Sequence, residues 1–243
     1  MTSHLTNYVK SITYLRNNFP NVPYILPETG SSIGSHPLNY SNAFGSTLWS
    51  SAFQLAAMAR GVERISMTQR PVAKHSLWVP NDSVSDKGMP GPSVRAPFTA
   101  QPFVADFIGK DGSSVVEVLG NPFATAYAAF GAGGSAERIA IVNLRLWYKG
   151  CGGPRGAMRF DVGVGAGSKA TLKRLHAASG VTAMGFDIGG PGENITWAGE
   201  QWTYKVDKGK GHVIGPTEET LPVTDGSVTI TVPDSEAVIL YLS

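Results

Sequence analysis

The spacing of apolar residues changes near residue 110, and this change limits the folds that the chain can adopt. Before that point, apolar residues recur every three or four positions in two stretches, at Leu5, Tyr8, Val9, Ile12 and Leu15 and at Phe44, Leu48, Ala52, Leu55, Ala56 and Ala59. This spacing is typical of helices with one apolar face. After that point, short alternating segments follow one another, separated by glycine and proline. The sequence therefore predicts an α/β part, residues 1–110, followed by an all-β part, residues 111–243.

The α/β part contains two predicted strands, residues 22–28 and 63–69, one on either side of the second helix. Gly61 stands where a left-handed residue commonly ends a helix, and the second strand follows directly. Short joins between strand, helix and strand are typical of parallel strands that a helix connects. Both strands then end at the same edge, so we expect Glu28 and Gln69 to lie side by side.

The all-β part is predicted to form an antiparallel β-sandwich after one further helix that ends near Ile108. The expected strands cover residues 114–119, 124–130, 138–148, 158–164, 202–206, 227–232 and 237–242. Turns rich in glycine and proline separate them. The domain boundary is therefore expected near residue 110.

Glu28 carries the strongest indication of chemistry in the chain. A run of uncharged residues, 22–27, leads to it, and small residues follow at 29–32. A carboxylate at the end of a buried strand is costly unless it has a role, and parallel α/β barrels place catalytic groups at this end of their strands. A solvated loop residue is the alternative interpretation. The uncharged strand and the room left by the small residues favour a catalytic carboxylate.

The length of the α/β part bears on what it can be. A closed eight-stranded barrel takes about 250 residues, so two strands before residue 110 cannot close one. Two alternatives are open: a small two-layer α/β unit, or the C-terminal portion of a (β/α)8 barrel. The chain begins almost directly on a helix, without a leading strand or a signal sequence. We therefore expect the second alternative, an incomplete barrel.

The stretch Gly30-Ser31-Ser32-Ile33-Gly34 offers a different chemistry. It matches the G-x-S-x-G elbow of serine hydrolases, with Ser32 as the nucleophile. A helix begins at the nucleophile of such an elbow, whereas Pro37 interrupts any helix that starts early here. The candidate bases are His75, His176 and His212. The pattern therefore favours the carboxylate over the serine.

Composition excludes several classes of partner. The formal net charge of +2 provides no electrostatic footprint for nucleic acid or an anionic membrane, and no apolar run approaches the roughly 20 residues of a membrane span. The histidines and the single cysteine, Cys151, lack the spacing of a metal site, so we expect no metal and no cofactor. Glycosylation sequons at Asn39, Asn81 and Asn194 favour a secreted glycoprotein.

Several stretches, taken together in their order and spacing, match a known pattern. They are Pro23-Tyr24-Ile25-Leu26-Pro27-Glu28-Thr29-Gly30-Ser31-Ser32, Phe44-Gly45-Ser46-Thr47-Leu48-Trp49, His75-Ser76-Leu77-Trp78, Val142-Asn143-Leu144-Arg145-Leu146-Trp147, residues 195–203 and residues 234–240. In these stretches nearly the whole chain resembles fungal glycoside hydrolase family 79, the β-glucuronidase and heparanase-like group. The resemblance implies that residues 1–110 are the part of a (β/α)8 barrel that carries its last two strands, and that residues 111–243 are a C-terminal β-sandwich domain.

The resemblance also implies a reaction. It predicts a retaining glycosidase that acts on a glucuronide or related glycoside, with Glu28 as the nucleophile. Retention requires a second carboxyl group, roughly 5 Å away, as acid and base. The family takes this group from the fourth barrel strand, which is absent here. The stand-ins in this chain are poor, because Glu63 opens its strand and Asp82, Asp86 and Asp106 lie in loops or a helix. We therefore expect the chain alone to be inactive.

A substrate site is implied in the same way. Family members bind the uronate carboxylate through the loop after the nucleophile, here Ile33-Gly34, where Gly34 offers a backbone amide. Ile33 replaces an expected tyrosine, which removes a hydroxyl donor. From their positions, Gln69, His75 and Trp78 are further candidates for binding the sugar. The alternative class of function is a non-catalytic carbohydrate-binding or structural module.

Overall fold

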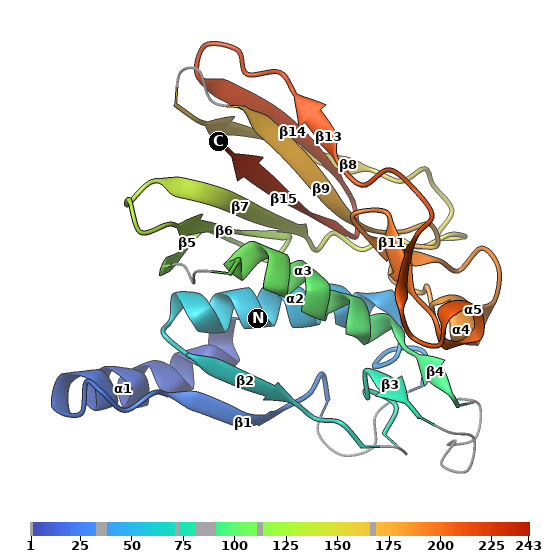
Figure 1. Ribbon diagram of the computed structural model, residues 1–243, viewed down its shortest axis with the longest axis horizontal. Helices are drawn as coiled ribbons and strands as arrows, with labels where there is room; N and C mark the ends of the chain where they lie inside the picture. The colour runs from blue at the N-terminus through green and yellow to red at the C-terminus, as the bar shows by residue number, and fades with distance from the viewer. Residues whose placement is uncertain (1, 33–37, 71–72, 81–90, 111–113, 166–168) are drawn as a thin grey trace.

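The computed structural model describes residues 2–32, 38–70, 73–80, 91–110, 114–165 and 169–243. The fold is mostly β with few helices, as the sequence predicts for its larger part. Figure 1 shows three layers. A large β-sheet lies above the helices α2 (Phe44–Ala59) and α3 (Ala100–Ile108), and a small sheet with the helix α1 (Thr2–Asn18) lies below them.

The small sheet consists of β1 (Ile25–Thr29) and β2 (Arg64–Met67), which pair in parallel. Thr29 lies opposite Met67, and the Thr68 N–H donates to the Thr29 carbonyl at 2.8 Å just beyond β2. Helix α2 connects the two strands. The predicted strand, helix and parallel strand are therefore confirmed.

Helix α2 ends at the residue that the sequence predicts. Gly61 has a φ of +91°, and its N–H donates to the Met58 carbonyl at 2.8 Å. Glycine adopts this left-handed conformation without the steric cost that a Cβ would bring. The chain can therefore leave the helix and enter β2 within a few residues.

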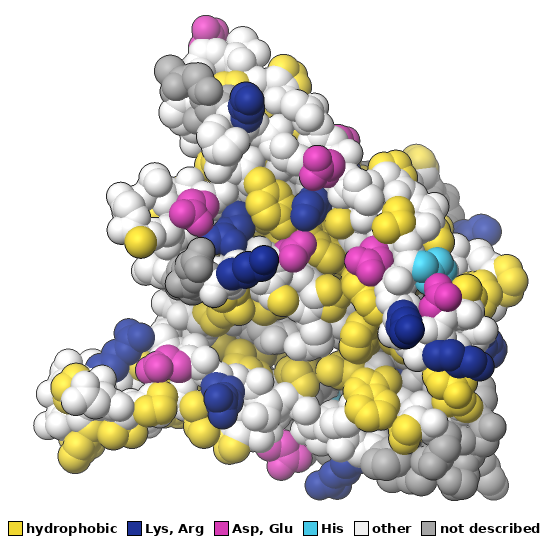
Figure 2. Space-filling model, in the orientation of Figure 1, with side chains coloured by type: hydrophobic (Ala, Val, Ile, Leu, Met, Phe, Trp, Pro, Cys, Tyr) yellow, Lys and Arg dark blue, Asp and Glu magenta, His cyan; other side chains and the backbone are white. Residues whose placement is uncertain are grey.

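The expectation that Glu28 ends a buried strand is wrong. Within β1 only Leu26 and Thr29 are buried, whereas Ile25 is 46% exposed. In the part of the chain that the structure describes, β1 pairs with β2 alone, so its other edge has no strand beside it. Apolar side chains gather on the surface from this edge of β1 to helix α1 (Figure 2). The exposed ones are Tyr8, Val9, Tyr14, Phe19, Val22 and Ile25.

Helix α2 is the centre of the molecule. It has no charged side chain and is buried on nearly all sides, as expected for a helix between two layers. Its N-terminus has no side-chain cap; instead, the Phe44 N–H donates to the Ala183 carbonyl at 2.8 Å and the Gly45 N–H to the Val181 carbonyl at 2.9 Å. These bonds satisfy N–H groups that a helix leaves open. They also join α2 to the C-terminal part, and one core extends across residue 110. The domain boundary there stays a prediction.

The connection from β2 to the large sheet passes through short elements. Strand β3 (Trp78–Val79) pairs with β4 (Ser93–Val94) in antiparallel fashion. The 3-10 helix η2 (Ala96–Thr99) then leads into α3. The further helix that the sequence predicts before residue 110 is therefore confirmed.

Within the described residues, nine strands form the large sheet, and all of its pairings are antiparallel. Their order is β12 (Gly211–Val213), β11 (Glu200–Trp202), β10 (Ile195–Trp197), β9 (Ala170–Ala177), β15 (Glu236–Leu242), β7 (Ala136–Asn143), β6 (Ala124–Phe130) and β5 (Ser114–Gly120), while β13 (Glu219–Leu221) pairs with the first residues of β9. The antiparallel arrangement predicted for the all-β part is confirmed.

The two faces of the large sheet bury different cores, because side chains alternate along each strand. Leu175 of β9 belongs to the core that contains α2 and α3. Leu172 points to the other face and belongs to a core beneath β14 (Ser227–Pro233), which pairs with β8 (Ala157–Gly163). The large sheet and the β8–β14 pair thus form the two layers of the predicted sandwich.

The strand expected over residues 138–148 is too long, because β7 ends at Asn143. The following residues leave the sheet and are held by Ser235. Its hydroxyl accepts from the Trp147 N–H at 2.8 Å and donates to the Arg145 carbonyl at 2.8 Å. A side chain distant in sequence therefore ends the strand.

The strand expected over residues 202–206 is also wrong. Strand β11 ends at Trp202, and the short helix α5 (Tyr204–Asp207) begins directly after Thr203. The Thr203 hydroxyl accepts from the Val206 N–H at 3.0 Å, which is the bond of a helix N-cap. Another short helix, α4 (Phe186–Gly189), lies in the preceding connection.

Strand β9 is not among the predicted strands, although it lies near the middle of the sheet. Lys173 and Arg174 interrupt the apolar alternation of its sequence. Both charges find partners in the fold: Lys173 Nζ lies 4.9 Å from the centre of the Tyr241 ring, and Arg174 pairs with Glu219. Long basic side chains can cover apolar surface while their charged ends reach such partners.

Candidate active site

Glu28 lies at the carboxyl end of β1, where β2 also ends. The Thr68 hydroxyl donates to Glu28 Oε1 at 3.5 Å. Glu28 is exposed, and it forms no ion pair with any residue that the structure describes. Thr68, which makes this bond, follows the end of β2 and directly precedes Gln69. The two strand ends therefore meet, as the parallel arrangement predicts.

The imidazole of His75 packs against Gly30, just beyond Glu28. A Cβ placed on Gly30 would lie 3.4 Å from His75 Cδ2 and 3.5 Å from Nε2, so the missing side chain leaves the room that the ring occupies. His75 is 7% exposed. The structure thus places His75, which is distant in the sequence, against Gly30 in the loop that follows β1.

Two buried side chains hold the loop that carries His75. The Ser76 hydroxyl accepts from the Arg70 N–H at 3.0 Å and donates to the Arg70 carbonyl. Arg95 is 1% exposed, and its Nη1 donates to the Ala73 carbonyl at 2.5 Å. Sequence patterns do not single out Arg95, because a lone arginine gives no sign that it will be buried. The burial of its guanidinium beneath this loop appears only in the fold.

Gln69 contacts the backbone of the next segment. Its Nε2 donates to the Trp78 carbonyl at 2.5 Å, and its Oε1 accepts from the Leu77 N–H at 2.9 Å. The Trp78 side chain is 45% exposed. Gln69 therefore fixes the position of Trp78, and a sugar hydroxyl would compete with these two bonds.

A hollow of about 300 Å³ lies beside the residues that follow Glu28. Its lining comes from the loop after β1 and from the first turns of α2: Ser31, Ser32, Tyr40, Ser41, Gly45, Ser46 and Trp49. Trp49 stacks on Phe53, with ring centres 5.1 Å apart and planes 21° apart. Ile33 and Gly34, the predicted uronate-binding residues, lie outside the described residues. Hydroxyl groups and two aromatic side chains, those of Tyr40 and Trp49, thus line a space of ligand size.

The other carboxylates weighed from the sequence do not join Glu28. Glu63 lies at the amino end of β2, where its N–H donates to the Tyr24 carbonyl at 2.9 Å. Asp106 of α3 accepts from Trp197 Nε1 at 3.0 Å on the face towards the large sheet. Asp82 and Asp86 lie outside the described residues. Neither Glu63 nor Asp106 therefore stands at the carboxyl end of β1.

Among the described residues, the first helix after Ser32 is α2, which begins only at Phe44, and residues 33–37 lie outside the described part of the chain. Two of the candidate bases lie in the β-sandwich part and have other partners. His176 Nδ1 lies 2.6 Å from Glu236, and His212 Nδ1 lies 2.9 Å from Asp207. The strand, nucleophile and helix geometry that this chemistry needs is therefore absent from this described segment.

Among the described residues, no group of three or more His, Cys, Asp or Glu side chains is placed to hold a metal ion. No helix in the same part of the chain has the length and apolar character needed to cross a membrane.

Comparison with known proteins identifies relatives of the chain. Residues 126–239 match the family model described as "Glycosyl hydrolase family 79 C-terminal beta domain". A β-glucuronidase of Aspergillus niger is 28% identical over 246 residues, which cover 93% of this chain and 42% of that protein. A β-glucuronidase of Neurospora crassa is 23% identical over 222 residues, covering 77% and 37%. The chain spans less than half the length of these relatives. The resemblance that the motifs indicate is confirmed.

Solved structures share the fold. The crystal structure of a 4-O-α-L-rhamnosyl-β-D-glucuronidase from Fusarium oxysporum 12S matches with a TM-score of 0.78 and 20% identity, over 99% of this chain and 47% of that one. A family 51 arabinofuranosidase from Xanthomonas axonopodis pv. citri matches with a TM-score of 0.57 and 12% identity, over 97% and 44%. At such identities the likeness concerns the fold alone. It extends over the small parallel sheet as well as the large antiparallel one.

Proposed function

This chain carries the glycosyl hydrolase family 79 C-terminal beta domain, and on that premise we propose that it is the C-terminal part of a retaining, β-glucuronidase-like glycosidase. Its similarity to two fungal β-glucuronidases supports a glycosidase function. The observation that carries the proposal is the place of Glu28 at the carboxyl end of a parallel strand. Because the chain spans less than half of those relatives, the proposed activity belongs to a longer protein.

In this proposal, residues 1–110 are the end of a (β/α)8 barrel with its last two strands, β1 and β2, and residues 111–243 are the β-sandwich domain. The parallel pairing of β1 and β2 through α2 supports this assignment. So do the open edge of β1 and the apolar surface over α1 (Figure 2). A closed barrel has no free edge. Further strands of the barrel would therefore pair with the open edge of β1 and cover the apolar surface over α1.

The mechanism assigned to Glu28 needs two carboxyl groups. Glu28 attacks the anomeric carbon and forms a glycosyl ester, while a second carboxyl group protonates the departing oxygen; the second group then deprotonates the water that hydrolyses the ester. The Thr68 hydroxyl lies 3.5 Å from Oε1 of Glu28, and in this proposal Oε2 is the oxygen that attacks. The second group must lie roughly 5 Å away, and we assign it to the part of the longer protein that precedes this chain. The chain alone is then inactive.

The proposed substrate is a glucuronide or a related glycoside. The backbone amide of Gly34, beside Ile33, is assigned to the uronate carboxylate. His75 and the exposed ring of Trp78 are assigned to the sugar. Gln69 is assigned to the same site, where its bonds to the backbone of Leu77 and Trp78 hold the aromatic ring in place.

The longer protein is proposed to be extracellular and glycosylated. The sequons at Asn39 and Asn81 support this location. No metal, cofactor or nucleic acid takes part in the proposed reaction.

The test is a chimera in which this chain replaces the matching C-terminal part of the Aspergillus niger β-glucuronidase. Hydrolysis of 4-nitrophenyl β-D-glucuronide is measured for the chimera and for its Glu28→Gln variant. We expect the variant to lose activity by at least about 10³-fold, because an amide cannot form the glycosyl ester. Glu63→Gln, at the opposite end of the neighbouring strand, is the matched control and should keep the activity.

Two further measurements separate the nucleophile from a supporting role. A 2-deoxy-2-fluoro-glucuronyl fluoride should form a stable ester, and peptide mass analysis should locate it on Glu28. NMR of the first product should show the β anomer. Equal rates for the two glutamine variants, or an α-anomeric first product, would contradict the proposal.

A further inference from the structure

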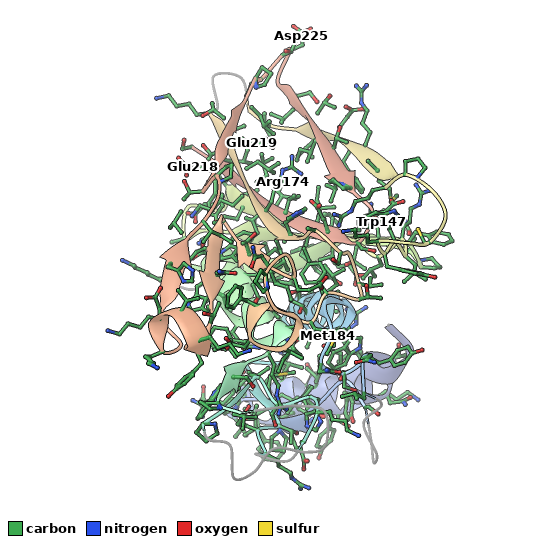
Figure 3. All side chains as sticks on the ribbon, turned by 90° about the vertical axis from the view of Figure 1, so that its right-hand side faces the viewer. Trp147, Arg174, Met184, Glu218, Glu219 and Asp225 are labelled. Carbon is green, nitrogen blue, oxygen red and sulfur yellow. The ribbon has the colours of Figure 1, made fainter. Side chains whose placement is uncertain are left out.

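The β-sandwich part contains a hollow of about 430 Å³ on the face of the large sheet turned away from α2 and α3. Leu172, Arg174 and His176 of β9 line its floor, since alternate residues of a strand share one face. The segment Ile214–Glu219 forms one wall. Figure 3 shows Arg174 between Glu218 and Glu219 on one side and the strand β14 on the other. Pockets of this size are typical of small-molecule sites.

The charged groups of the hollow are held in place. Arg174 Nη2 pairs with Glu219 Oε1 at 2.5 Å, and Nη1 donates to the Thr231 carbonyl at 3.1 Å. Glu218 adds a second carboxylate to the lining. Two carboxylates and one guanidinium therefore face the space. The extra negative charge disfavours an anionic ligand, whereas a neutral ligand meets no electrostatic penalty.

His176 is oriented by a buried carboxylate. Its Nδ1 lies 2.6 Å from Glu236 Oε1, and the same oxygen lies 3.0 Å from Arg155 Nη1. The Glu236 side chain is 3% exposed, whereas the His176 side chain is 44% exposed. With Nδ1 turned to Glu236, the orientation of the ring is fixed and the other ring nitrogen, Nε2, is left for a hydrogen bond to a ligand.

Three other polar side chains of the lining have hydrogen-bonding capacity to spare. Asn194, Thr196 and Thr217 form no side-chain hydrogen bond with any residue in the described part of the chain. Between them lie apolar groups, among them Ile214 and Pro216. Groups that both donate and accept, placed around apolar surface, match a ligand with several hydroxyls and an apolar face.

We propose that this hollow binds a neutral pyranose sugar. The ring hydroxyls bond to the Asn194 side-chain amide nitrogen, the threonine hydroxyls and His176 Nε2. The C–H face of the ring lies on the apolar lining. The site is a binding site only and uses no residue of the Glu28 proposal.

The test uses the full chain produced in bacteria, so that Asn194 carries no glycan. Saturation-transfer NMR is recorded with methyl β-D-glucopyranoside, methyl β-D-galactopyranoside and methyl β-D-glucuronide. We expect saturation transfer to at least one neutral glycoside and weaker binding of the glucuronide. Thr217→Val and Asn194→Ala should each weaken the binding of the neutral glycoside about 3- to 10-fold, which is the effect of one lost hydrogen bond.

Thr220→Val is the matched control, since Thr220 is an exposed residue of β13 that does not line the hollow. Circular dichroism and thermal melts establish that each variant folds like the parent chain. The proposal is overturned if neither neutral glycoside binds, if the glucuronide binds more tightly than both, or if the Thr217 and Thr220 variants bind alike.

Discussion

Arg155 should be among the most costly charged side chains to remove, because four groups of the protein surround its guanidinium. Its Nε donates to the Asp234 carbonyl at 2.7 Å and its Nη2 to the Ser235 carbonyl at 2.8 Å. Its Nη1 donates to the Ala177 carbonyl at 3.2 Å and lies 3.0 Å from Glu236 Oε1. Burial lowers the pKa of Arg155, and the Glu236 carboxylate opposes that shift. The group is held charged inside the sandwich by these partners.

Replacement by methionine keeps much of the apolar stem and removes every one of these bonds. Among the described residues, the Glu236 carboxylate, 3% exposed, would then keep His176 as its one side-chain partner. Removing one member of a buried ion pair costs about 3–5 kcal/mol, since the other charge stays buried without compensation. The three carbonyls lose their donors as well. We therefore expect Arg155→Met to lower the free energy of unfolding by about 3–5 kcal/mol.

Urea unfolding followed by tryptophan fluorescence measures this loss. For a urea dependence of about 1–3 kcal/mol per molar, the midpoint should fall by at least about 1 M. Arg159→Met is the matched control, because Arg159 and Asp161 form a pair whose side chains are 69% and 60% exposed. Water screens such an exposed pair, so the control variant should unfold at nearly the same urea concentration as the parent.

The double variant Arg155→Met with Glu236→Gln tests the cause. Removing the buried charge together with its partner should cost less than the sum of the two single changes. A loss below about 1 kcal/mol for Arg155→Met, or strict additivity with Glu236→Gln, would refute a role for the buried ion pair.

Two further changes test other buried groups. Asp187 accepts from the N–H groups of Val94 and Tyr204 at 2.7 Å and of Lys205 at 3.1 Å. Asp187→Ala should therefore lower the free energy of unfolding by about 2 kcal/mol or more. A thermal melt like that of the parent would show that these bonds do not stabilise the fold. Burial raises the pKa of Tyr127 from 10.0 to about 12. The unfolded chain releases this proton at a lower pH than the folded chain does, so the free energy of unfolding should fall as the pH rises from 10 to 12. Tyr127→Phe should make that fall shallower. Identical pH profiles for the two proteins would contradict a raised pKa of Tyr127.

Local patterns predict much of the fold. The helical spacing of α2 and the glycine at its end appear in the structure at the expected residues, and β1 and β2 pair in parallel. Strands β5, β6, β8, β14 and β15 lie within about two residues of their expected bounds. Propensity, period and turn residues act over a few neighbouring positions, so the sequence carries these features locally.

Contacts between distant segments explain the errors. Ser235 ends β7 by bonding to Arg145 and Trp147, and the partners of Lys173 and Arg174 let a charged segment occupy the middle of a sheet. No local pattern contains these partners. The exposure of β1 has the same origin, because it depends on whether another strand lies at its free edge.

The sequence by itself determined the three longer helices, about half of the strands, the position of Glu28 at the end of a parallel strand, and the relationship to a glycosidase family. Only the tertiary structure decided what surrounds these residues. It placed His75 against Gly30 and buried Arg95 beneath the same loop. It also left a hollow over β9 in the sandwich. The physical reason is that periodicity is a property of neighbours in the chain, whereas burial, ion pairing and cavities arise only when distant segments pack together.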